Sequence, residues 1–345
     1  MDTIRAGVVG LGGIGFAHLQ GYQQLPHATV VAVCDTIPER LERARDEFGV
    51  PETCTAYREL CDRDDLDVVS VCTGHKWHAE ISIAALQAGC HVLCVKPMAI
   101  NSADASAMCR AARENGRQLM IGQNARLSPE TQLLKRLAEE GRFGKIYYIR
   151  AQALRRRGIP DRPSFIDETL TAGGPLLDIG VHIIDAAVWL AGFPRPIAAS
   201  GTTYCELGQR EDVVGDWDRT RYGVEDLAAA FVRFEGGLSM TVESSFAMHG
   251  PDDFNLSLFG SQMGANLDPL QLYQDDAGAM MTVSPNVPRQ RESAHYVETR
   301  LFVEAVREGK PSPMPGEQSL VTMRILDAIY ASAHSGSEVP ISGED

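Results

Sequence analysis

The chain has 345 residues, of which 44% are hydrophobic and 23% charged, and its formal net charge is −14. This length favours two domains, and the composition is typical of a globular protein with hydrophobic cores. The negative charge argues against nucleic acid or an anionic membrane surface as the main partner. We expect a cytoplasmic protein, because no stretch approaches the ~20 apolar residues of a membrane span and no secretory signal precedes the first predicted strand.

The 8 cysteines form no Cys-x-x-Cys pair, which argues against a zinc finger or a dithiol redox motif. Cys34, Cys72 and Cys94 fall within predicted buried strands, where cysteine acts as a small hydrophobic residue. We therefore expect reduced thiols, and we expect no metal site.

The N-terminal region carries a nucleotide-binding pattern. A predicted strand leads into a glycine-rich run and then into a predicted helix, and the run is Gly10-Leu11-Gly12-Gly13-Ile14-Gly15. Gly10 allows a tight turn, Gly12 lets a pyrophosphate approach the backbone, and Gly15 allows the helix to pack closely on the sheet. The N-terminus of that helix offers N–H groups and partial positive charge to phosphates.

A second predicted strand, 29–33, precedes Asp35, about twenty residues after the last glycine of the run. An acidic residue at this spacing binds the ribose hydroxyls in dinucleotide-binding folds. Its charge would repel a 2′-phosphate, so we predict NAD in preference to NADP, a preference that Arg40 could soften. The alternative is a glycine-rich turn of another α/β protein, with Asp35 as a helix cap. Thr36 is a second candidate cap for the next predicted helix.

Strand and helix patterns alternate as far as residue 123, which predicts a doubly wound parallel sheet with right-handed crossovers. Ligands of such sheets gather at the carboxyl ends of the strands. Besides the glycine run and Asp35, the candidate cofactor contacts at that edge are Thr73, His75, His78, Lys96 and Pro97. Both histidines could equally be loop and cap residues, and Lys96 on its own could be an exposed lysine at a strand end.

The second part of the chain is rich in strands with little helix between them, so its pairing is predicted to be largely antiparallel. The predicted strands are 146–153, 197–204, 228–234, 238–246 and 254–259, and the final helices 293–308 and 316–333. We place a dinucleotide-binding domain at 1–123 and a substrate-binding and oligomerisation domain at 124–345. Helices for only one face of an apolar sheet predict a homodimer or homotetramer.

Residues 173–185 read Gly-Gly-Pro-Leu-Leu-Asp-Ile-Gly-Val-His-Ile-Ile-Asp. Asp178 and His182 are four residues apart, so they share one face of a helix. Together with the glycine-rich N-terminus and Val95-Lys96-Pro97, this motif resembles the Gfo/Idh/MocA family, the glucose–fructose oxidoreductase and inositol dehydrogenase group. The resemblance covers essentially the whole chain.

The resemblance implies a Rossmann domain followed by an α+β domain with a large open, mostly antiparallel sheet. It also implies NAD(P)-dependent oxidation or reduction of a sugar or cyclitol carbon, with the family's Lys, Asp and His at Lys96, Asp178 and His182. The family motif is usually Glu-Lys-Pro, but this sequence has Val95 at the first position. Lys96 therefore lacks one possible partner. Asn124 matches a family position near the substrate.

Oxidation of a secondary alcohol removes a hydride from carbon and a proton from oxygen. Histidine suits the proton acceptor, because its unperturbed pKa of about 6.5 lies near the operating pH. Our hypothesis is that His182 accepts the hydroxyl proton and that Lys96 stabilises the developing negative charge on the same oxygen. Asp178 would orient the substrate or the imidazole.

Other interpretations of these residues stay open. His182 could be a core histidine, and Asp178, His182 and Asp185 could together hold a metal. Arg155 and Arg156 could rim the substrate pocket or form a solvated face. For the whole protein, the alternatives to a dehydrogenase are a redox-assisted glycosidase that retains its NAD and a non-catalytic NAD-binding sensor.

Overall fold

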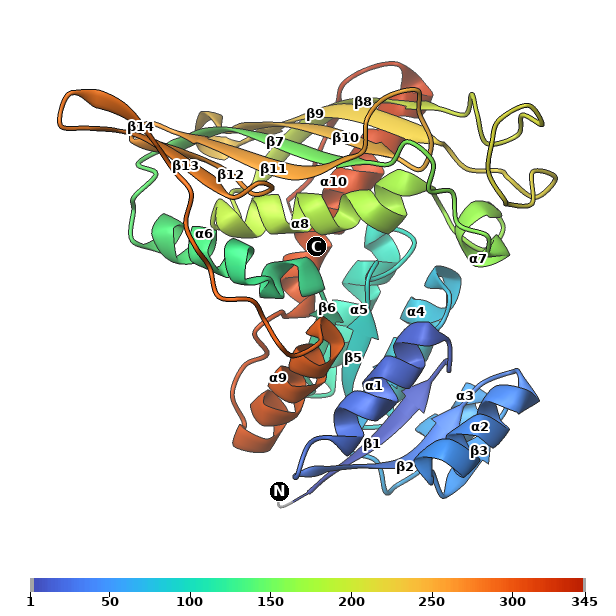
Figure 1. Cartoon of the computed structure of the whole chain (residues 1–345). Coiled ribbons are helices and arrows are strands. Elements are labelled where there is room, and N and C mark those ends of the chain that lie inside the picture. Colours follow the sequence, from blue (N-terminus) through green and yellow to red (C-terminus); the bar gives the residue numbers. More distant parts are fainter. Residues whose placement is uncertain (1–2, 344–345) are drawn as a thin grey trace. The chain divides into compact units, whose positions relative to one another are not determined.

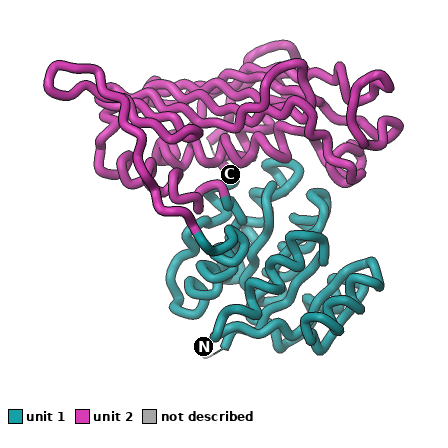
Figure 2. Tube along the Cα trace, in the orientation of Figure 1, with its two compact units in different colours: residues 1–124, 291–320 teal, residues 125–290, 321–345 magenta. Residues whose placement is uncertain are grey.

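The computed structural model describes residues 3–343 (Figure 1). The chain folds into two compact units, coloured separately in Figure 2. The first contains the chain up to Asn124 together with Arg291–Leu320, and the second contains Ala125–Gln290 together with the chain from Val321 onward. The predicted boundary followed residue 123, whereas the first unit extends to Asn124 and also contains residues 291–320, which the prediction assigned to the second domain.

The first unit contains a six-stranded parallel sheet with the order β3-β2-β1-β4-β5-β6, which confirms the predicted Rossmann fold. The strands β1, β4, β5 and β6 are almost continuously buried, as expected for a sheet that helices cover on both faces, whereas the edge strand β3 has no buried residue. The strands are β1 Ile4–Val9, β2 Ala28–Cys34, β3 Glu52–Cys54, β4 Val68–Val71, β5 His91–Val95 and β6 Leu119–Gly122. The helices are α1 Gly13–Gln23, α2 Pro38–Phe48, α3 Tyr57–Cys61, α4 His78–Gln87, α5 Ser102–Glu114 and α9 Ala294–Glu308.

Helix α9 packs beside α1 although the two come from opposite ends of the chain (Figure 1). A Cβ at Gly21 would lie 2.5 Å from Thr299 Oγ1, so the glycine lets the two helices approach closely. Beyond α9, the backbone follows the outer edge of β6, where Ile121 N donates a hydrogen bond to Met314 O at 3.0 Å. A late segment of the chain thus covers the edge strand of the parallel sheet.

The second unit contains a nine-stranded sheet with the order β14-β13-β12-β11-β7-β10-β9-β8-β15. Only β7 and β10 pair in parallel, so the mostly antiparallel prediction is confirmed. The strands are β7 Ile146–Leu154, β8 Pro196–Tyr204, β9 Leu227–Phe234, β10 Ser239–Ser245, β11 Asp253–Gly260, β12 Met263–Asn266, β13 Gln271–Asp276, β14 Ala279–Val283 and β15 Val339–Pro340. The helices are α6 Pro129–Glu139, α7 Pro163–Ile166, α8 Val181–Leu190 and α10 Gly316–Ser335, the last of which spans the boundary at Val321.

The two faces of this sheet differ. Ile149, Ala151 and Ala153 of β7 are buried on the face along which α8 lies (Figure 1). On the alternate positions, Tyr148 and Phe259 are half-buried and their rings lie 5.2 Å apart. Self-association through this second face stays a prediction. Among the described residues, no helix combines the length and the apolar character needed to cross a bilayer.

Candidate active site

The loop between β1 and α1 lies at the carboxyl edge of the parallel sheet. Gly10 has a φ of 90°, and a Cβ there would lie 2.7 Å from the carbonyl group of Cys72. A Cβ at Gly15 would overlap the carbonyl oxygen of Gly10, so only glycine fits at this position of α1. By contrast, a Cβ at Gly12 or Gly13 would meet no other described atom within 4 Å. Gly10 and Gly15 therefore serve the fold, whereas Gly12 and Gly13 border open space at the N-terminus of α1.

This open space fits a dinucleotide pyrophosphate. Gly12 is the N-cap of α1 and has no side chain to fill the space in front of the helix, so the first free N–H groups face it. Ile14, in the first turn, is 40% exposed. Both the steric and the electrostatic requirements of a phosphate site are thus met by the predicted loop.

Asp35 holds the same loop from the end of β2. Its Oδ2 accepts a hydrogen bond from Leu11 N at 2.6 Å, and its Oδ1 accepts one from Ile37 N at 2.9 Å. The prediction that Thr36 caps α2 is wrong, because Ile37 is the N-cap and the carboxylate of Asp35 bonds its N–H. Arg40 Nη1 lies 3.2 Å from Asp35 Oδ2, so an ion pair offsets part of the charge that would repel a 2′-phosphate.

His78 joins two loops at the carboxyl edge. Its Nδ1 lies 2.7 Å from Pro97 O, and its Nε2 lies 3.0 Å from Thr73 O. The side chain is fully buried, and this burial lowers the pKa of His78. The neighbouring His75 is also buried, its ring lies 5.8 Å from that of His78, and burial lowers its pKa well below the usual value. Two buried imidazoles that pack together, one of them bonded to backbone carbonyl groups of both loops, are closer to the loop-and-cap alternative than to direct cofactor contact.

Three neighbouring strands bring the remaining first-unit candidates to this edge. β4, β5 and β6 pair in parallel, with Val71 opposite Cys94 and Val95 opposite Gly122. Thr73, Lys96 and Asn124, which follow those strands, are consequently adjacent in the order of the sheet. Lys96 is half-buried, and a cis peptide bond joins it to Pro97.

Gln123, directly after β6, is a candidate that the sequence did not single out as a site residue. It is 1% exposed, and neither its Nε2 nor its Oε1 has a hydrogen-bond partner among the described residues. Buried amides are normally satisfied, because an unmade hydrogen bond in the interior costs about 1–3 kcal/mol. Because its amide lacks a partner among the described residues and it directly precedes Asn124, Gln123 is a candidate contact for a polar ligand. The only sequence signal was its position at the end of a predicted strand.

In the second unit, the Gly-Gly motif builds a specific helix start. A Cβ at Gly173 would overlap the hydroxyl oxygen of Tyr330, and a Cβ at Gly174 would overlap the carbonyl oxygen of Glu225. The Glu225 carboxylate accepts hydrogen bonds from Gly174 N at 2.8 Å and Leu176 N at 3.1 Å, and Tyr330 OH donates to it at 2.9 Å. Sequence analysis missed Glu225 because its partners lie far from it along the chain.

The helix begins with a π-helical turn, Leu176–Gly180, that continues into α8. Asp178 lies in this turn and is 6% exposed, whereas His182 lies in the first turn of α8 and is half-buried. π-helical turns within helices are frequent at functional sites. The prediction that a helix carries both side chains is therefore correct, although its first turn is wider than an α-helical one.

This turn is anchored at the carboxyl end of β10. Ser244 Oγ donates a hydrogen bond to Pro175 O at 2.8 Å, and a Cβ at Gly180 would lie 3.1 Å from the same hydroxyl oxygen. The parallel partner β7 ends at the same edge, where Arg155 N donates to Ser245 O at 3.0 Å. The backbone of Arg156 is held by Asp252 Oδ1 at 2.7 Å. The side chains of Arg155 and Arg156 are exposed at this edge.

Asp185, the third acid of the motif, has a separate role. It is fully buried and accepts hydrogen bonds from Arg126 Nε at 2.6 Å and Nη2 at 2.7 Å. Burial raises the pKa of Asp185, and the guanidinium opposes that rise. Because this ion pair occupies the carboxylate, Asp185 is not available to complete a metal site with Asp178 and His182.

The predicted catalytic residues are thus divided between the units. Lys96 and Asn124 belong to the first, and Asp178, His182 and the arginines belong to the second. Within each unit, the predicted residues gather at one edge of the sheet. Their convergence on one substrate stays a prediction.

Comparison with protein families gives two matches that together cover most of the chain. Residues 4–123 match the model of the GFO/IDH/MocA oxidoreductase family with an NAD-binding Rossmann fold. Residues 131–265 match the model of the GFO/IDH/MocA C-terminal domain. The first unit is accordingly an NAD-binding Rossmann fold.

Relatives of known activity align over nearly the full length. The chain is 32% identical to D-glucoside 3-dehydrogenase of Escherichia coli K12 over 350 residues, which cover 99% of this chain and 98% of that protein. It is 27% identical to myo-inositol 2-dehydrogenase of Thermotoga maritima over 331 residues, which cover 93% of each.

Solved structures show the same architecture. An oxidoreductase domain protein from Kribbella flavida superimposes with a TM-score of 0.85 at 27% identity, covering 99% of this chain and 100% of that chain. A levoglucosan dehydrogenase in complex with NADH and levoglucosan superimposes with a TM-score of 0.86 at 25% identity, with the same coverage.

Proposed function

The chain belongs to the GFO/IDH/MocA oxidoreductase family, and on that premise we propose that it is an NAD-dependent dehydrogenase of a sugar, a sugar derivative or an inositol. The observation that carries the proposal is the anchored turn with Asp178 and His182 at the ends of β7 and β10, in a chain whose other unit binds NAD. A binding protein without turnover has no need of a buried acid and a half-buried imidazole on one such turn.

Each residue has one task in the proposed reaction. NAD⁺, when bound to the first unit, supplies the hydride acceptor. The neutral imidazole of His182 accepts the proton of the substrate hydroxyl. The Lys96 ammonium group donates a hydrogen bond to the same oxygen and stabilises the negative charge that develops on it. Asp178 accepts a hydrogen bond from the substrate or from the imidazole and so fixes the orientation of the pair.

We further propose that NAD is preferred over NADP. The Asp35 carboxylate lies at the end of β2, where a 2′-phosphate would meet its negative charge. Its ion pair with Arg40 makes this exclusion partial. Some NADP-dependent turnover is consequently expected at high coenzyme concentration.

The test is the appearance of NADH absorbance with a panel of glucosides, anhydrosugars, free sugars and inositols, each with NAD⁺ and with NADP⁺. Turnover of one of these classes with NAD⁺ is expected. If no member of the panel reduces either coenzyme, the proposal is overturned. A coenzyme that stays bound to the protein through desalting, together with glycoside cleavage and no net release of NADH, would favour the redox-assisted glycosidase instead.

We also propose that the protein is a cytoplasmic homodimer or homotetramer. Tyr148 and Phe259 lie half-buried and side by side on the face of the second sheet opposite α8, and such aromatic side chains suit a subunit contact. Light scattering at micromolar concentration tests this point, and a monomeric mass would contradict it. Cell fractionation tests the location.

A further inference from the structure

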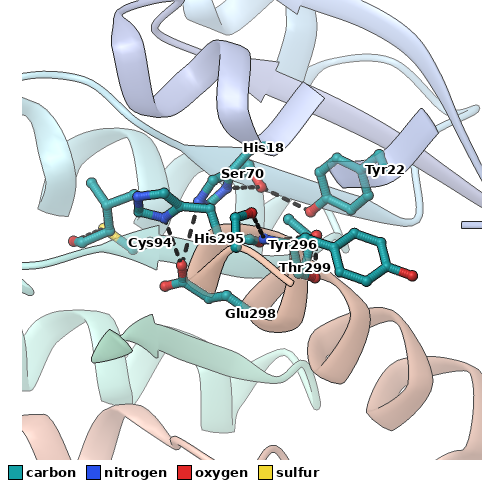
Figure 3. Close-up of polar contacts among 10 residues, drawn as sticks. His18, Tyr22, Ser70, Cys94, His295, Tyr296, Glu298 and Thr299 are labelled. Atoms are coloured by element: carbon teal, nitrogen blue, oxygen red, sulfur yellow. Dashed lines mark hydrogen bonds and ion pairs between the residues drawn. The ribbon is translucent and has the colours of Figure 1, made fainter. Parts of the chain in front are cut away.

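A group of metal-ligating side chains lies outside the candidate active site, between α1 and α9 (Figure 3). His18 of α1 and His295 and Glu298 of α9 each place one ligand atom within 4.8 Å of the other two. His295 and Glu298 are three residues apart, so they lie on the same face of α9. Sequence spacing alone does not connect His18 with the other two, because they lie near opposite ends of the chain.

The separations of the three ligand atoms are close to those around a bound metal ion. Glu298 Oε2 lies 3.0 Å from His295 Nδ1 and 3.8 Å from His18 Nε2. Tetrahedral zinc has ligand atoms at about 2.0–2.2 Å, which places those atoms roughly 3.4 Å from one another. Small side-chain rotations are therefore enough to bring the three atoms to a common ion.

The orientation of His18 leaves one ring nitrogen directed into the group. His18 is fully buried, and its Nε2 has no hydrogen-bond partner among the residues that the structure describes. Its Nδ1 lies 3.1 Å from Ser70 Oγ, which lies 2.8 Å from Tyr22 OH. An Nδ1–H donated to Ser70 leaves the Nε2 lone pair free to face Glu298. Metal-binding histidines are typically held by such a second hydrogen bond.

The buried carboxylate of Glu298 needs a balancing charge. It is 1% exposed and packs against Gly122 of β6, where a Cβ would overlap its Oε1. Burial of an unbalanced carboxylate is costly. A dication would balance the carboxylate, and the neutral imidazole is the form that ligates metals.

We propose that His18 Nε2, His295 Nδ1 and Glu298 Oε2 bind a divalent transition-metal ion of the zinc type. Two imidazoles and one carboxylate suit this ion, and water completes the coordination. The ion enters past His295, whose side chain is 25% exposed. Its role is structural, because it fastens α9 to the helix that follows the glycine-rich loop. This inference is independent of the proposed dehydrogenase activity.

The first experiment measures metal binding directly. The full-length protein, without any polyhistidine tag, is stripped with a chelator and titrated with Co²⁺ and with Zn²⁺. The expected result is one equivalent of Zn²⁺ bound with a Kd below about 1 μM. Co²⁺ should give the visible absorption of a four-coordinate site and lose it when Zn²⁺ is added. Zn²⁺ should raise the Tm by roughly 5 °C.

Variants locate the ion. His295→Gln is the main variant, because this half-buried residue can be changed with little risk to folding, and it should abolish the Co²⁺ spectrum and the Tm shift. Ser70→Ala should weaken binding by roughly 10- to 100-fold, as expected for a residue that orients a metal ligand. The matched control is His27→Gln, since His27 is an exposed histidine of the same unit. It should bind Zn²⁺ like the unchanged protein.

Two results would overturn the proposal. One is the absence of stoichiometric binding in the stripped protein, which would mean that water or a proton satisfies the group. The other is tight binding that persists unchanged in His295→Gln, which would place the ion elsewhere.

Discussion

Arg126 and Asp185 form a buried ion pair through two hydrogen bonds, Nε to Oδ2 at 2.6 Å and Nη2 to Oδ1 at 2.7 Å. The exposed fraction of each side chain is at most 1%. The Arg126 guanidinium also lies over the rings of Trp189 and Phe193. The pair thus ties the segment before α6 to α8, the helix that carries His182.

Loss of one partner of this pair should be far more costly than loss of both. Arg126→Met leaves a buried carboxylate without its counter-charge and should lower the free energy of unfolding by about 3–5 kcal/mol. The double variant Arg126→Met/Asp185→Leu should recover part of that loss. Urea unfolding of the three proteins measures the difference. A single variant within about 1 kcal/mol of the unchanged protein would contradict this interpretation.

The glycine-rich loop offers a matched pair of substitutions. Gly12→Ala should leave the Tm unchanged, because no described atom lies within 4 Å of the new Cβ, but it should weaken NAD binding by at least about tenfold, or 1.4 kcal/mol. Gly15→Ala should instead lower the Tm, because its Cβ overlaps the carbonyl oxygen of Gly10. Thermal unfolding and coenzyme fluorescence separate the two effects. Equal effects of both variants on the Tm would show that this division of roles is wrong.

The proton acceptor can be tested without disturbing the coenzyme site. His182→Ala should lower kcat by at least ~100-fold, the low end for loss of a general base, while NADH binding is retained. The control is His334→Ala, which changes an exposed histidine of α10 in the same unit. Steady-state kinetics on the best substrate of the panel gives both values. A near-normal kcat in His182→Ala would remove this residue from the mechanism.

Gln123→Leu distinguishes a ligand-binding amide from a structural one. The amide has no hydrogen-bond partner among the described residues, so an apolar side chain of similar size should leave the free energy of unfolding unchanged or raise it. The variant should nevertheless lower kcat/KM by roughly tenfold through the loss of one polar contact with a ligand. If stability falls and kcat/KM does not, Gln123 serves the fold.

The pH dependence of stability should include a contribution from His91. Burial, helped by Arg117, lowers the pKa of His91, and Asp67 opposes this only in part. The Nδ1 of His91 accepts a hydrogen bond from Gln118 N at 2.9 Å, which a proton on that nitrogen would break. Because the folded-state pKa lies below the unfolded value of about 6.5, the unfolded chain binds the proton first. Stability is therefore lost as the pH falls from about 6.5 toward the folded-state pKa.

The test compares the unchanged protein with His91→Asn in urea at pH 7.5 and at pH 5.5. Asparagine Oδ1 can accept the same hydrogen bond but does not titrate in this range. The variant should lose less stability on acidification, by an amount that partial exposure of the ring keeps small. An equal loss in both proteins would show that His91 does not contribute.

The parallel sheet could be predicted because its determinants are local. The glycine run, Asp35 and the apolar strands each specify their own turn or strand, and alternation then favours a doubly wound parallel sheet. The short edge strand β3 was not predicted. The destination of α9 could not be predicted in this way. It depends on the contact of Gly21 with Thr299 and on the edge of β6, which are long-range contacts that no local pattern encodes.

In the candidate active site too, only the features with local sequence determinants could be predicted. The Asp178–His182 segment was recognisable as a motif, but the reasons for its two leading glycines are side chains distant in sequence, Glu225 and Tyr330. Asp35 stays a predicted ribose ligand, and its carboxylate accepts a hydrogen bond from the N–H of Ile37, the N-cap residue of α2 where Thr36 was expected. Short strands such as β12 and β14 were missed, because their few residues carry little alternation and gain stability only from sheet neighbours.

The late return of α9 to the first unit has a consequence for biosynthesis. The ribosome releases all six strands of the parallel sheet before it has made the helix that covers one flank of α1. An excised fragment that stops at residue 123 should therefore expose His18 and Tyr22 to solvent and aggregate on its own. Supplying the missing helix as a separate peptide should rescue it, in the manner of a split protein.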